Sequence, residues 1–193
     1  MKKMLFASAN AHKVSEMRTL LSPLGIELLG LKDLGFDVEI PENGISLREN
    51  ASIKARFLYK QIGFDCFADD TGLEVEALGG APGVFSARYA GEPANSERNI
   101  EKLLSALKGN SKRAAQFKTV ICLIQEGEEY FFEGVVAGSI STTITGESGF
   151  GYDPVFIPEG YTLSFAEMPA ALKNSISHRA KAVSAMLSWL KLQ

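Results

Sequence analysis

Residues 64–73 read Phe64-Asp65-Cys66-Phe67-Ala68-Asp69-Asp70-Thr71-Gly72-Leu73 and place two adjacent carboxylates directly after an apolar run. The run before the carboxylates is short and rich in aromatic residues, which is typical of a mostly buried strand. Thr71 and Gly72 are predicted to break this strand before strand-like alternation resumes at Leu73. Two carboxylates held about 4 Å apart at the strand end would repel by roughly 4 kcal/mol at an effective dielectric constant near 20.

A fold tolerates such a pair when one carboxyl is protonated or when a cation lies between the two groups. No Lys or Arg is close to Asp69 and Asp70 in the sequence, so a divalent metal ion is the simplest interpretation. The alternative is that both residues cap a solvated turn, where Asp is common. The pair on its own leaves these two interpretations open.

The composition is that of an ordinary globular protein. Its 193 residues, 46% hydrophobic and 22% charged, are enough to bury a substantial core in a single domain, with room for two lobes. No apolar run approaches the roughly 20 residues that span a bilayer, and the apolar part of the N-terminus is too short for a signal peptide. We therefore expect a cytoplasmic protein without a membrane partner.

Charge and cysteine content narrow the chemistry. The formal net charge is −3 at pH 7 and no block of Lys or Arg stands out, which argues against a nucleic-acid partner. An anionic ligand would then be bound by individually placed cations and backbone N–H groups. Cys66 and Cys122 lie in apolar stretches and are predicted to be buried thiols. Because His12 and His178 are the only histidines, a zinc site of Cys and His is not available.

Helical and strand-like patterns alternate along the chain. Apolar spacing predicts helices over residues 11–21, 46–62, 100–107 and 183–190, the second opened by a capping box from Ser46 to Glu49. Strands are expected over residues 3–8, 116–125 and 130–140, the last two joined by a hairpin at residues 126–129. This interleaving predicts an α/β fold with a mixed central sheet flanked by helices.

The turn after the first strand, Ser8-Ala9-Asn10-Ala11-His12-Lys13, leads directly into a helix. Free backbone N–H groups and the helix dipole at such a turn favour an anion. Ser8 and Asn10 add side-chain donors, and Lys13 adds a full charge. The alternative is an ordinary N-cap followed by a surface lysine. No Walker A sequence occurs in the chain.

Three further segments carry polar or aromatic groups. Gly149-Phe150-Gly151-Tyr152-Asp153-Pro154 offers an exposed aromatic that can stack on a purine, or else forms a turn with two core aromatics. Ser177-His178-Arg179 opens the last helix, with Lys173 just before it, and presents either ligand donors or a solvated basic pair. Glu42 adds a carboxylate on a turn, whereas Lys54 is expected to be a solvated residue on the polar face of its helix.

In their order along the chain, these segments resemble the inosine/xanthosine triphosphate pyrophosphatase family, whose members hydrolyse non-standard purine nucleoside triphosphates. The resemblance covers nearly the full length. The matching segments are Asn10 with Lys13, Glu42-Asn43-Gly44, Glu49-Asn50-Ala51, and residues 68–73, 78–84, 86–89, 149–154 and 177–179. The chain departs from the usual pattern at Ser8-Ala9 (commonly Thr-Gly), His12 (frequently Gly) and Thr71 (commonly Ser). None of these changes removes a catalytic group.

The resemblance implies two α/β lobes with the active-site cleft between them, a Mg²⁺-dependent cut between the α- and β-phosphates, and a homodimer. Asp70 is the implied catalytic carboxylate that activates water. Glu42 and Asp70 are the implied metal ligands, with Asp69 as a neighbour that joins through water. The implied substrate-binding residues are Ser8, Ala9, Asn10, Ala11, His12 and Lys13 for the triphosphate, Thr71, and Phe150, Gly151, Tyr152, Asp153, Lys173, His178 and Arg179 for the base and the phosphates.

The chemistry of these residues agrees with the implied reaction. Hydrolysis of a phosphoanhydride needs a positioned water, a base and neutralisation of phosphate charge, and Mg²⁺ binds carboxylate and phosphate oxygens. Donors from His178 and Arg179 are expected to favour the 6-oxo group of inosine and xanthosine over the 6-amino group of adenine. Two other functions stay open: a pyrophosphatase for modified pyrimidine nucleotides, and a nucleotide-binding module without hydrolysis, against which the carboxylates argue.

Overall fold

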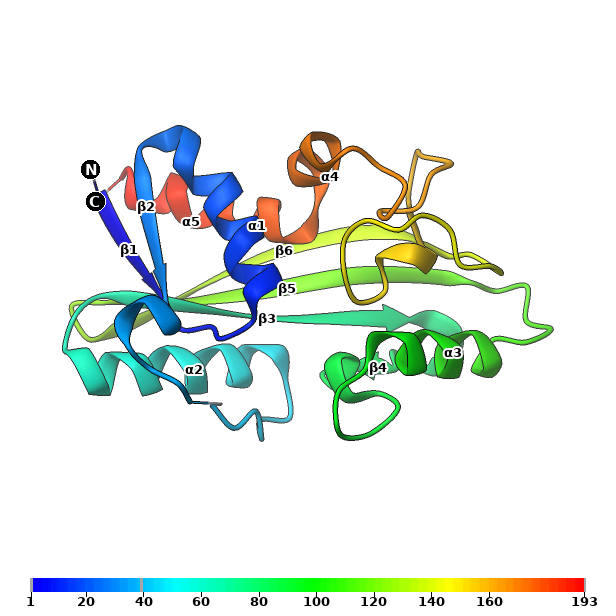
Figure 1. Ribbon diagram of the computed structural model, residues 1–193, viewed down its shortest axis with the longest axis horizontal. Helices are drawn as coiled ribbons and strands as arrows, with labels where there is room; N and C mark the ends of the chain where they lie inside the picture. Colours follow the sequence, from blue (N-terminus) through cyan, green and yellow to red (C-terminus); the bar gives the residue numbers. More distant parts are fainter. Residues whose placement is uncertain (1, 39, 193) are drawn as a thin grey trace. The chain divides into compact units, whose positions relative to one another are not determined.

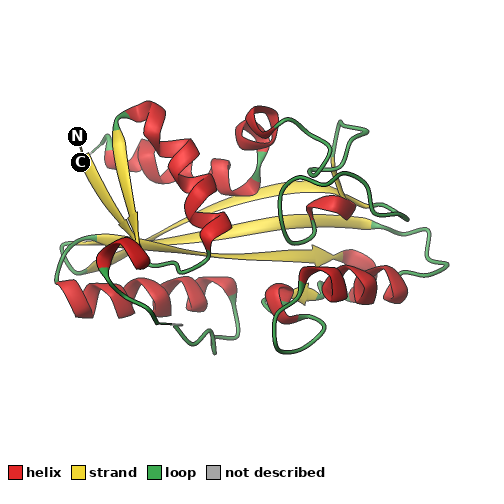
Figure 2. Ribbon diagram, in the orientation of Figure 1, coloured by secondary structure: helices red, strands yellow, loops and turns green. Residues whose placement is uncertain are grey.

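A mixed sheet runs through the protein (Figure 1, Figure 2). The computed structural model describes residues 2–38 and 40–192, and within this part seven strands form one sheet in the order β2-β1-β3-β5-β6-β7, with β4 paired to β3. β1 is parallel to β2 and β3, whereas β4 and β7 are antiparallel to β3 and β6. The strands are β1 (Lys2–Phe6), β2 (Ile26–Gly30), β3 (Cys66–Val75), β4 (Pro82–Gly83), β5 (Ala114–Gln125), β6 (Glu128–Ile140) and β7 (Phe156–Pro158). The predicted α/β class with a mixed sheet is confirmed.

The chain divides into two compact units. Unit 1 comprises residues 1–70, 119–134 and 178–193, and unit 2 comprises residues 71–118 and 135–177, so that β3, β5 and β6 contribute to both. The helices of unit 1 are α1 (Ala11–Leu21), η1 (Ser22–Leu24), η2 (Lys32–Leu34), α2 (Leu47–Ile62) and α5 (His178–Leu190). Those of unit 2 are η3 (Glu76–Leu78), η4 (Ser86–Arg88), α3 (Ser96–Ala106), η5 (Asp153–Val155) and α4 (Ala170–Ile176). None of the described helices is long and apolar enough to cross a membrane.

In unit 1, helices cover both faces of the sheet. On one face, α1 and α5 pack against β1, β3 and β5 through a cluster that includes Met17, Phe6, Phe67, Ile121 and Met186. On the other face, α2 packs against the same strands through a cluster that includes Ala51, Leu58, Cys66, Ala68 and Cys122. Successive residues of a strand point to opposite faces, which is why Phe67 and Ala68 fall in different clusters. The same alternation fixes the directions of the two carboxylates that follow.

The helix boundaries in unit 1 follow from capping. Asn10 begins α1, because its side-chain oxygen accepts a hydrogen bond from the backbone N–H of Lys13 at 3.1 Å. Ser46 begins α2 in the same way, with the N–H of Glu49 at 3.2 Å. The predicted helices over residues 11–21 and 46–62 are confirmed. The predicted hairpin between β5 and β6 is confirmed too, and Glu126 and Gly127 turn it with positive φ angles of 53° and 86°.

The predicted break at Thr71 and Gly72 is wrong, because β3 continues without interruption from Cys66 to Val75. Thr is a β-branched residue that suits a strand, and Leu73 beyond it pairs with Gly83 of β4. The carboxylates therefore lie in the middle of a strand rather than on a turn. Cys66 and Cys122 are buried free thiols, as predicted. The short elements β2, β4, β7 and α4 were not anticipated from the sequence.

Candidate active site

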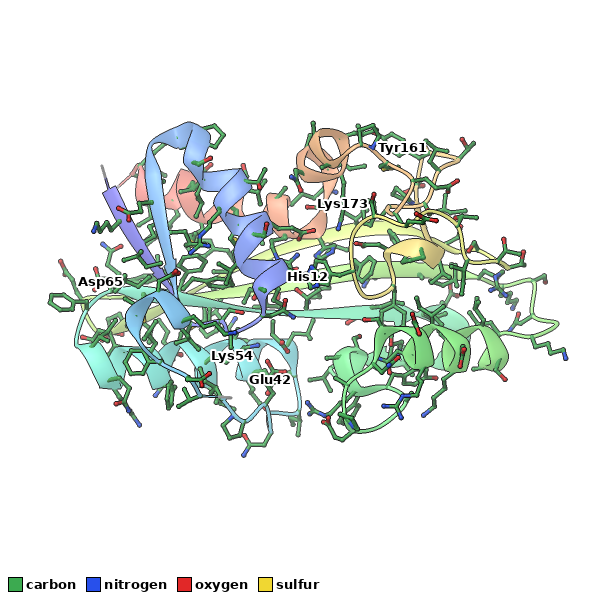
Figure 3. The ribbon with its side chains drawn as sticks, viewed as in Figure 1. His12, Glu42, Lys54, Asp65, Tyr161 and Lys173 are labelled. Atoms are coloured by element: carbon green, nitrogen blue, oxygen red, sulfur yellow. The ribbon has the colours of Figure 1, made fainter. Side chains whose placement is uncertain are left out.

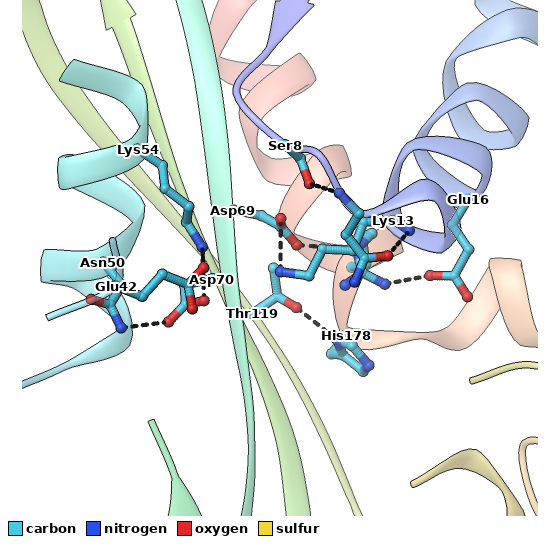
Figure 4. A network of polar contacts seen from close by, with 12 residues as sticks. Ser8, Lys13, Glu16, Glu42, Asn50, Lys54, Asp69, Asp70, Thr119 and His178 are labelled. Carbon is cyan, nitrogen blue, oxygen red and sulfur yellow. Dashed lines mark hydrogen bonds and ion pairs between the residues drawn. The ribbon is translucent and has the colours of Figure 1, made fainter. Parts of the chain in front are cut away.

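Asp69 and Asp70 point to opposite faces of β3 (Figure 4). Asp69 faces α1 and α5, as Phe67 does, and Asp70 faces α2, as Ala68 does. Their exposed fractions are only 1% and 4%, so neither caps a solvated turn. The alternative interpretation, one cation shared between the two groups, does not match this geometry either, because the two side chains lie on opposite faces of the strand. Each carboxylate meets its own cations, which come from segments distant in the sequence.

Asp69 is held by two cations. The ammonium of Lys13 lies 3.1 Å from its Oδ1, and Nε of Arg179 lies 3.2 Å from its Oδ2. Burial alone would raise the pKa of Asp69, but these two charges outweigh burial and hold that pKa well below its usual range. Arg179 is 1% exposed, and its guanidinium also pairs with Glu16 of α1. Asp69 is therefore a fixed anion that joins the first and last helices of unit 1.

Asp70 belongs to a second network, on the α2 side. Its Oδ1 accepts a hydrogen bond from the ammonium of Lys54 at 2.9 Å, and the same ammonium lies 2.5 Å from Oε1 of Glu42 (Figure 4). Figure 3 labels Lys54 and Glu42 among the other side chains. Its Oδ2 accepts a hydrogen bond from the side-chain amide of Asn50 at 3.2 Å. Burial raises the pKa of Asp70, Lys54 opposes this effect, and the nearby charge of Glu42 adds to it. Of the two carboxyls, Asp70 is the one suited to exchange a proton.

Lys54 is not the solvated residue that was expected. It is 5% exposed, and although burial works to lower its pKa, the charges of Asp70 and Glu42 raise that pKa above the ordinary value. Lys54 lies on the buried side of α2, one turn after Asn50 and beside Ala51 and Ala55. Its ammonium therefore lies between Asp70 and Glu42, the two carboxylates that the family resemblance implies as metal ligands.

The donor set around Asp70 fits a magnesium ion. Within residues 2–38 and 40–192, no three His, Cys, Asp or Glu side chains gather closely enough to form a complete cage. Mg²⁺ seldom needs one, since it commonly takes one or two carboxylates and fills its other positions with water and substrate phosphate. Glu42 and Asp70 already converge on one cationic group, the Lys54 ammonium. They are the residues that would hold the ion.

The turn between β1 and α1 combines a helix N-terminus with a cation. Ser8 is buried and its hydroxyl accepts a hydrogen bond from the N–H of Asn10 at 3.3 Å, while residues 9–12 are exposed. The ammonium of Lys13 is directed to Asp69 and its side chain is only 14% exposed, so Lys13 is not a surface lysine. Burial lowers its pKa. The arrangement can accept an anion, as expected for such a turn.

His178 begins α5 and is 4% exposed. Its Nδ1 lies 2.6 Å from the hydroxyl of Thr119 on β5, which is fully buried (Figure 4). This contact fixes the plane of the imidazole, and the direction of the shared proton selects its tautomer. The structure thus brings His178 and Arg179 into the same unit as Asp70, Glu42 and the first turn.

The remaining predicted residues belong to unit 2. Asp153 Oδ2 accepts hydrogen bonds from the N–H of Phe150 at 2.8 Å and from the ammonium of Lys173 at 2.6 Å. That ammonium also lies 5.2 Å from the centre of the Phe150 ring. Tyr152 is 4% exposed and its hydroxyl donates to the carbonyl of Ser86 at 2.9 Å, so this ring is a core aromatic rather than an exposed one. Phe150 is half-buried, which leaves it as the stacking candidate.

Two positions of the loop of residues 149–154 have backbone conformations that favour glycine. A Cβ on Gly149, whose φ is +79°, would lie 2.1 Å from Asp153 Oδ2, so only glycine allows the carboxylate to fold back onto the loop. Gly151 also has a positive φ of 63°. Thr71 follows Asp70 in β3 and is half-buried.

Comparison with known proteins agrees with these features. The model of the Ham1 family matches residues 4–189. The chain belongs to the Ham1 family. A dITP/XTP pyrophosphatase of Porphyromonas gingivalis is 53% identical over 191 residues, and one of Flavobacterium johnsoniae is 50% identical over 188 residues, with 98% and 97% of each chain covered. A Ham1 protein of Coxiella burnetii has a TM-score of 0.89 at 38% identity over 100% of both chains. The Ham1 protein of Staphylococcus aureus has a TM-score of 0.87 at 37% identity over 98% of both chains.

Membership of the Ham1 family confirms the resemblance, but four polar residues of the site had not been singled out for it from the sequence. They are Glu16, Asn50, Lys54 and Thr119. Asn50 lies next to Ala51 in the stripe of α2 that is buried, and Lys54 lies one turn later on the same side, which the structure shows to be buried too. Thr119 lies two residues before Ile121 in β5, on the same face, so strand alternation places it opposite α5. Glu16 lies near Lys13 on α1 and carried no further signal.

Proposed function

We propose that this protein hydrolyses non-standard purine nucleoside triphosphates, such as ITP, dITP and XTP, to the monophosphate and pyrophosphate with the help of Mg²⁺. The observation that carries the proposal is the buried Asp70, whose carboxylate shares one cation with Glu42. Relatives that share half of the residues of this chain are dITP/XTP pyrophosphatases. The reaction would act in the cytoplasm on the free nucleotide pool, and the working form would be a homodimer.

Asp70 is the base in this scheme. A carboxyl whose pKa burial raises holds a proton more firmly than an ordinary aspartate, so it accepts one more readily from an attacking water at neutral pH. Asn50 and Lys54 each donate to one oxygen of this carboxylate, which keeps it in one orientation. Glu42 and Asp70 would hold Mg²⁺, which, when bound, supplies charge neutralisation to phosphate oxygens.

The turn of residues 8–13 is the proposed phosphate-binding element. Its exposed backbone opens α1, where the helix dipole favours negative charge, and the Lys13 ammonium lies beneath it on Asp69. Asp69 holds this ammonium in place, and its charge opposes the lowering of the Lys13 pKa by burial. The residue thus acts on phosphate through Lys13 rather than through water on a metal ion.

Each unit, taken by itself, carries candidate residues for base recognition. Phe150 would stack on the purine, with Lys173 and Asp153 setting its loop. His178 and Arg179 would supply donors to the 6-oxo group. Since the guanidinium of Arg179 is already engaged by Asp69 and Glu16, His178 is the stronger candidate for direct contact.

A panel of substrates tests this proposal. Release of pyrophosphate from ITP, XTP, dITP, GTP and ATP, and from methylated pyrimidine triphosphates, should be measured with Mg²⁺ and with EDTA. We expect rapid release from the first three nucleotides with Mg²⁺ only. Fastest release from a pyrimidine nucleotide would favour a pyrimidine pyrophosphatase, and binding without release would favour a module that has lost hydrolysis.

A further inference from the structure

Asn50 has a second contact, to the loop that carries Glu42, that the proposed reaction scheme does not use. It lies in the first turn of α2 and is completely buried, with an exposed fraction of 0%. Both ends of its side-chain amide are used: Nδ2 donates to Asp70 Oδ2 at 3.2 Å, and Oδ1 accepts from the backbone N–H of Gly44 at 2.8 Å. One side chain therefore connects Asp70 to the loop that carries Glu42, and Figure 4 shows its contact with Asp70.

Lys54, one helical turn later, repeats the same pattern. Its ammonium contacts Asp70 through Oδ1 and Glu42 through Oε1. α2 thus holds the two oxygens of Asp70 with two side chains four residues apart, and holds the Glu42 loop with the same two side chains. Because residues four apart lie on one face of a helix, α2 acts as a rigid bracket between the carboxylates.

The loop packs closely against this bracket. A Cβ on Gly44 would lie 2.8 Å from Asn50 Oδ1 and 2.7 Å from the Cβ of Glu49, distances at which something must move. The N–H of Ile45 donates to the carboxylate of Glu49 at 2.7 Å, although the side chain of Ile45 is 86% exposed. The loop is thus tied to α2 by its backbone, while its outer side chain makes little contact.

We propose that Asn50 is a positioning residue for the hydrolysis, which sets the direction of the Asp70 carboxylate and the place of the Glu42 loop together. The inference rests on the proposed function for its kinetic part. The amide of Asn50 carries, in one planar group and without a change of protonation, a donor for Asp70 and an acceptor for Gly44. Asp at this position would keep the acceptor and lose the donor, and Ala would lose both.

This difference gives the test. N50D keeps the shape of the side chain and the bond to Gly44, but opposes two carboxylates. N50A removes both bonds. N43A, in the same loop at an exposed position, is the matched control. For each variant, kcat and KM for ITP are measured at saturating Mg²⁺, Mn²⁺ affinity is measured by electron paramagnetic resonance, and exchange of the Gly44 amide proton is followed by NMR.

We expect N50D to lower kcat by about 10- to 100-fold and to weaken Mn²⁺ binding, as loss of a partner to a ligating group does, with KM for ITP nearly unchanged. Gly44 should stay protected from exchange in N50D and lose protection in N50A. N43A should match the wild-type protein. A wild-type kcat for folded N50D, or a raised KM with unchanged kcat, would overturn the positioning role.

A double variant makes the test independent of turnover. N50D/D70N exchanges the amide and the carboxylate, so the bond between positions 50 and 70 can form with donor and acceptor reversed. Its melting temperature should exceed that of N50D, and no recovery would contradict the bond. Should N50A fail to fold, N50D and this exchange carry the test. If the wild-type protein released no pyrophosphate, the proposed function would fail while melting and Gly44 exchange still decided the role of Asn50.

Discussion

Replacing Lys54 by Met tests whether its ammonium stabilises the fold as the structure indicates. Met has a similar length and no charge, so the variant removes a cation that lies 2.9 Å from Asp70 and 2.5 Å from Glu42. At 2.9 Å a unit-charge pair attracts by about 6 kcal/mol at an effective dielectric constant near 20. The side chain of Glu42 is 28% exposed, so solvent screens part of its share, whereas Asp70 is almost fully enclosed.

Two estimates bound the loss of unfolding free energy in K54M. Removing one partner of a buried ion pair destabilises a protein by about 3–5 kcal/mol, because an uncompensated charge is left inside. Asp70 can instead take up a proton, so that no uncompensated charge is buried. Protonating an ordinary carboxyl near neutral pH costs about 1.4 kcal/mol for each pH unit above its pKa, or roughly 4 kcal/mol. For a chain of this length, 3–4 kcal/mol corresponds to a melting temperature lower by roughly 6–16 °C.

The assay is thermal unfolding followed by circular dichroism in EDTA. K60M is the matched control, since Lys60 lies in the last turn of the same helix and is exposed. The difference in melting temperature between K54M and the wild-type protein should become smaller at acidic pH. In K54M the pKa of Asp70 rises further above its value in the unfolded chain, so the folded variant loses stability as the pH rises through that range and regains it as the pH falls.

Magnesium should raise the melting temperature of K54M more than it raises that of the wild-type protein. Two carboxylates without the ammonium form a better cation site, and a ligand at about 100 times its Kd stabilises by about 2.7 kcal/mol. The reasoning is refuted if K54M in EDTA melts within about 2 °C of the wild-type protein, which corresponds to less than about 1 kcal/mol.

Three further predictions use other residues. Asp70→Asn should lower pyrophosphate release from ITP at least about a hundredfold with an unchanged circular dichroism spectrum, and near-normal turnover would remove Asp70 from its role. Arg179→Ala should lower the free energy of unfolding, measured in urea, by about 3–5 kcal/mol, because it leaves Asp69 and Glu16 without their guanidinium. The same variant should lower the ratio of the ITP hydrolysis rate to the ATP hydrolysis rate. Burial raises the pKa of the Cys66 and Cys122 thiols to about 12, so neither should react with a thiol reagent at pH 8 until the protein is unfolded; labelling of the native protein within minutes would contradict this.

Sequence reasoning succeeded where one local pattern decides the structure. The helix predicted over about residues 11–21 is confirmed, because its apolar positions recur at helical spacing, and in the structure Asn10 caps its start. The capping box at Ser46 succeeded for the same reason. The break at Thr71 was predicted wrongly because β3 is extended by pairing with β4, in which Gly83 lies opposite Leu73, which is ten residues before it in the chain. Local propensity cannot include a pairing that only the folded chain supplies.

The site was harder to predict than the fold, since its charges are matched through space. Lys54 was read as solvated because a lysine among polar helix positions usually is, and only the unseen Asp70 makes its burial favourable. Arg179 and Lys13 lie 110 and 56 residues from Asp69, so no window around the carboxylate pair contains its counterions. The family resemblance implied which residues would bind metal and substrate, but it did not say which cation meets which anion.

Because successive side chains of β3 face opposite sides of the sheet, the two adjacent aspartates lie in different environments. Had they shared one side of the strand, their repulsion would have raised the pKa of one or both, and one cation would have served the pair. On opposite sides, Asp69 meets Lys13 and Arg179 and stays ionised, so it can hold α1 and α5 in place whatever happens at the reaction centre. Asp70, with its pKa raised by burial, can take up a proton without loosening that support. A single strand thus separates a carboxylate that stays charged, Asp69, from a carboxyl that can take up a proton, Asp70.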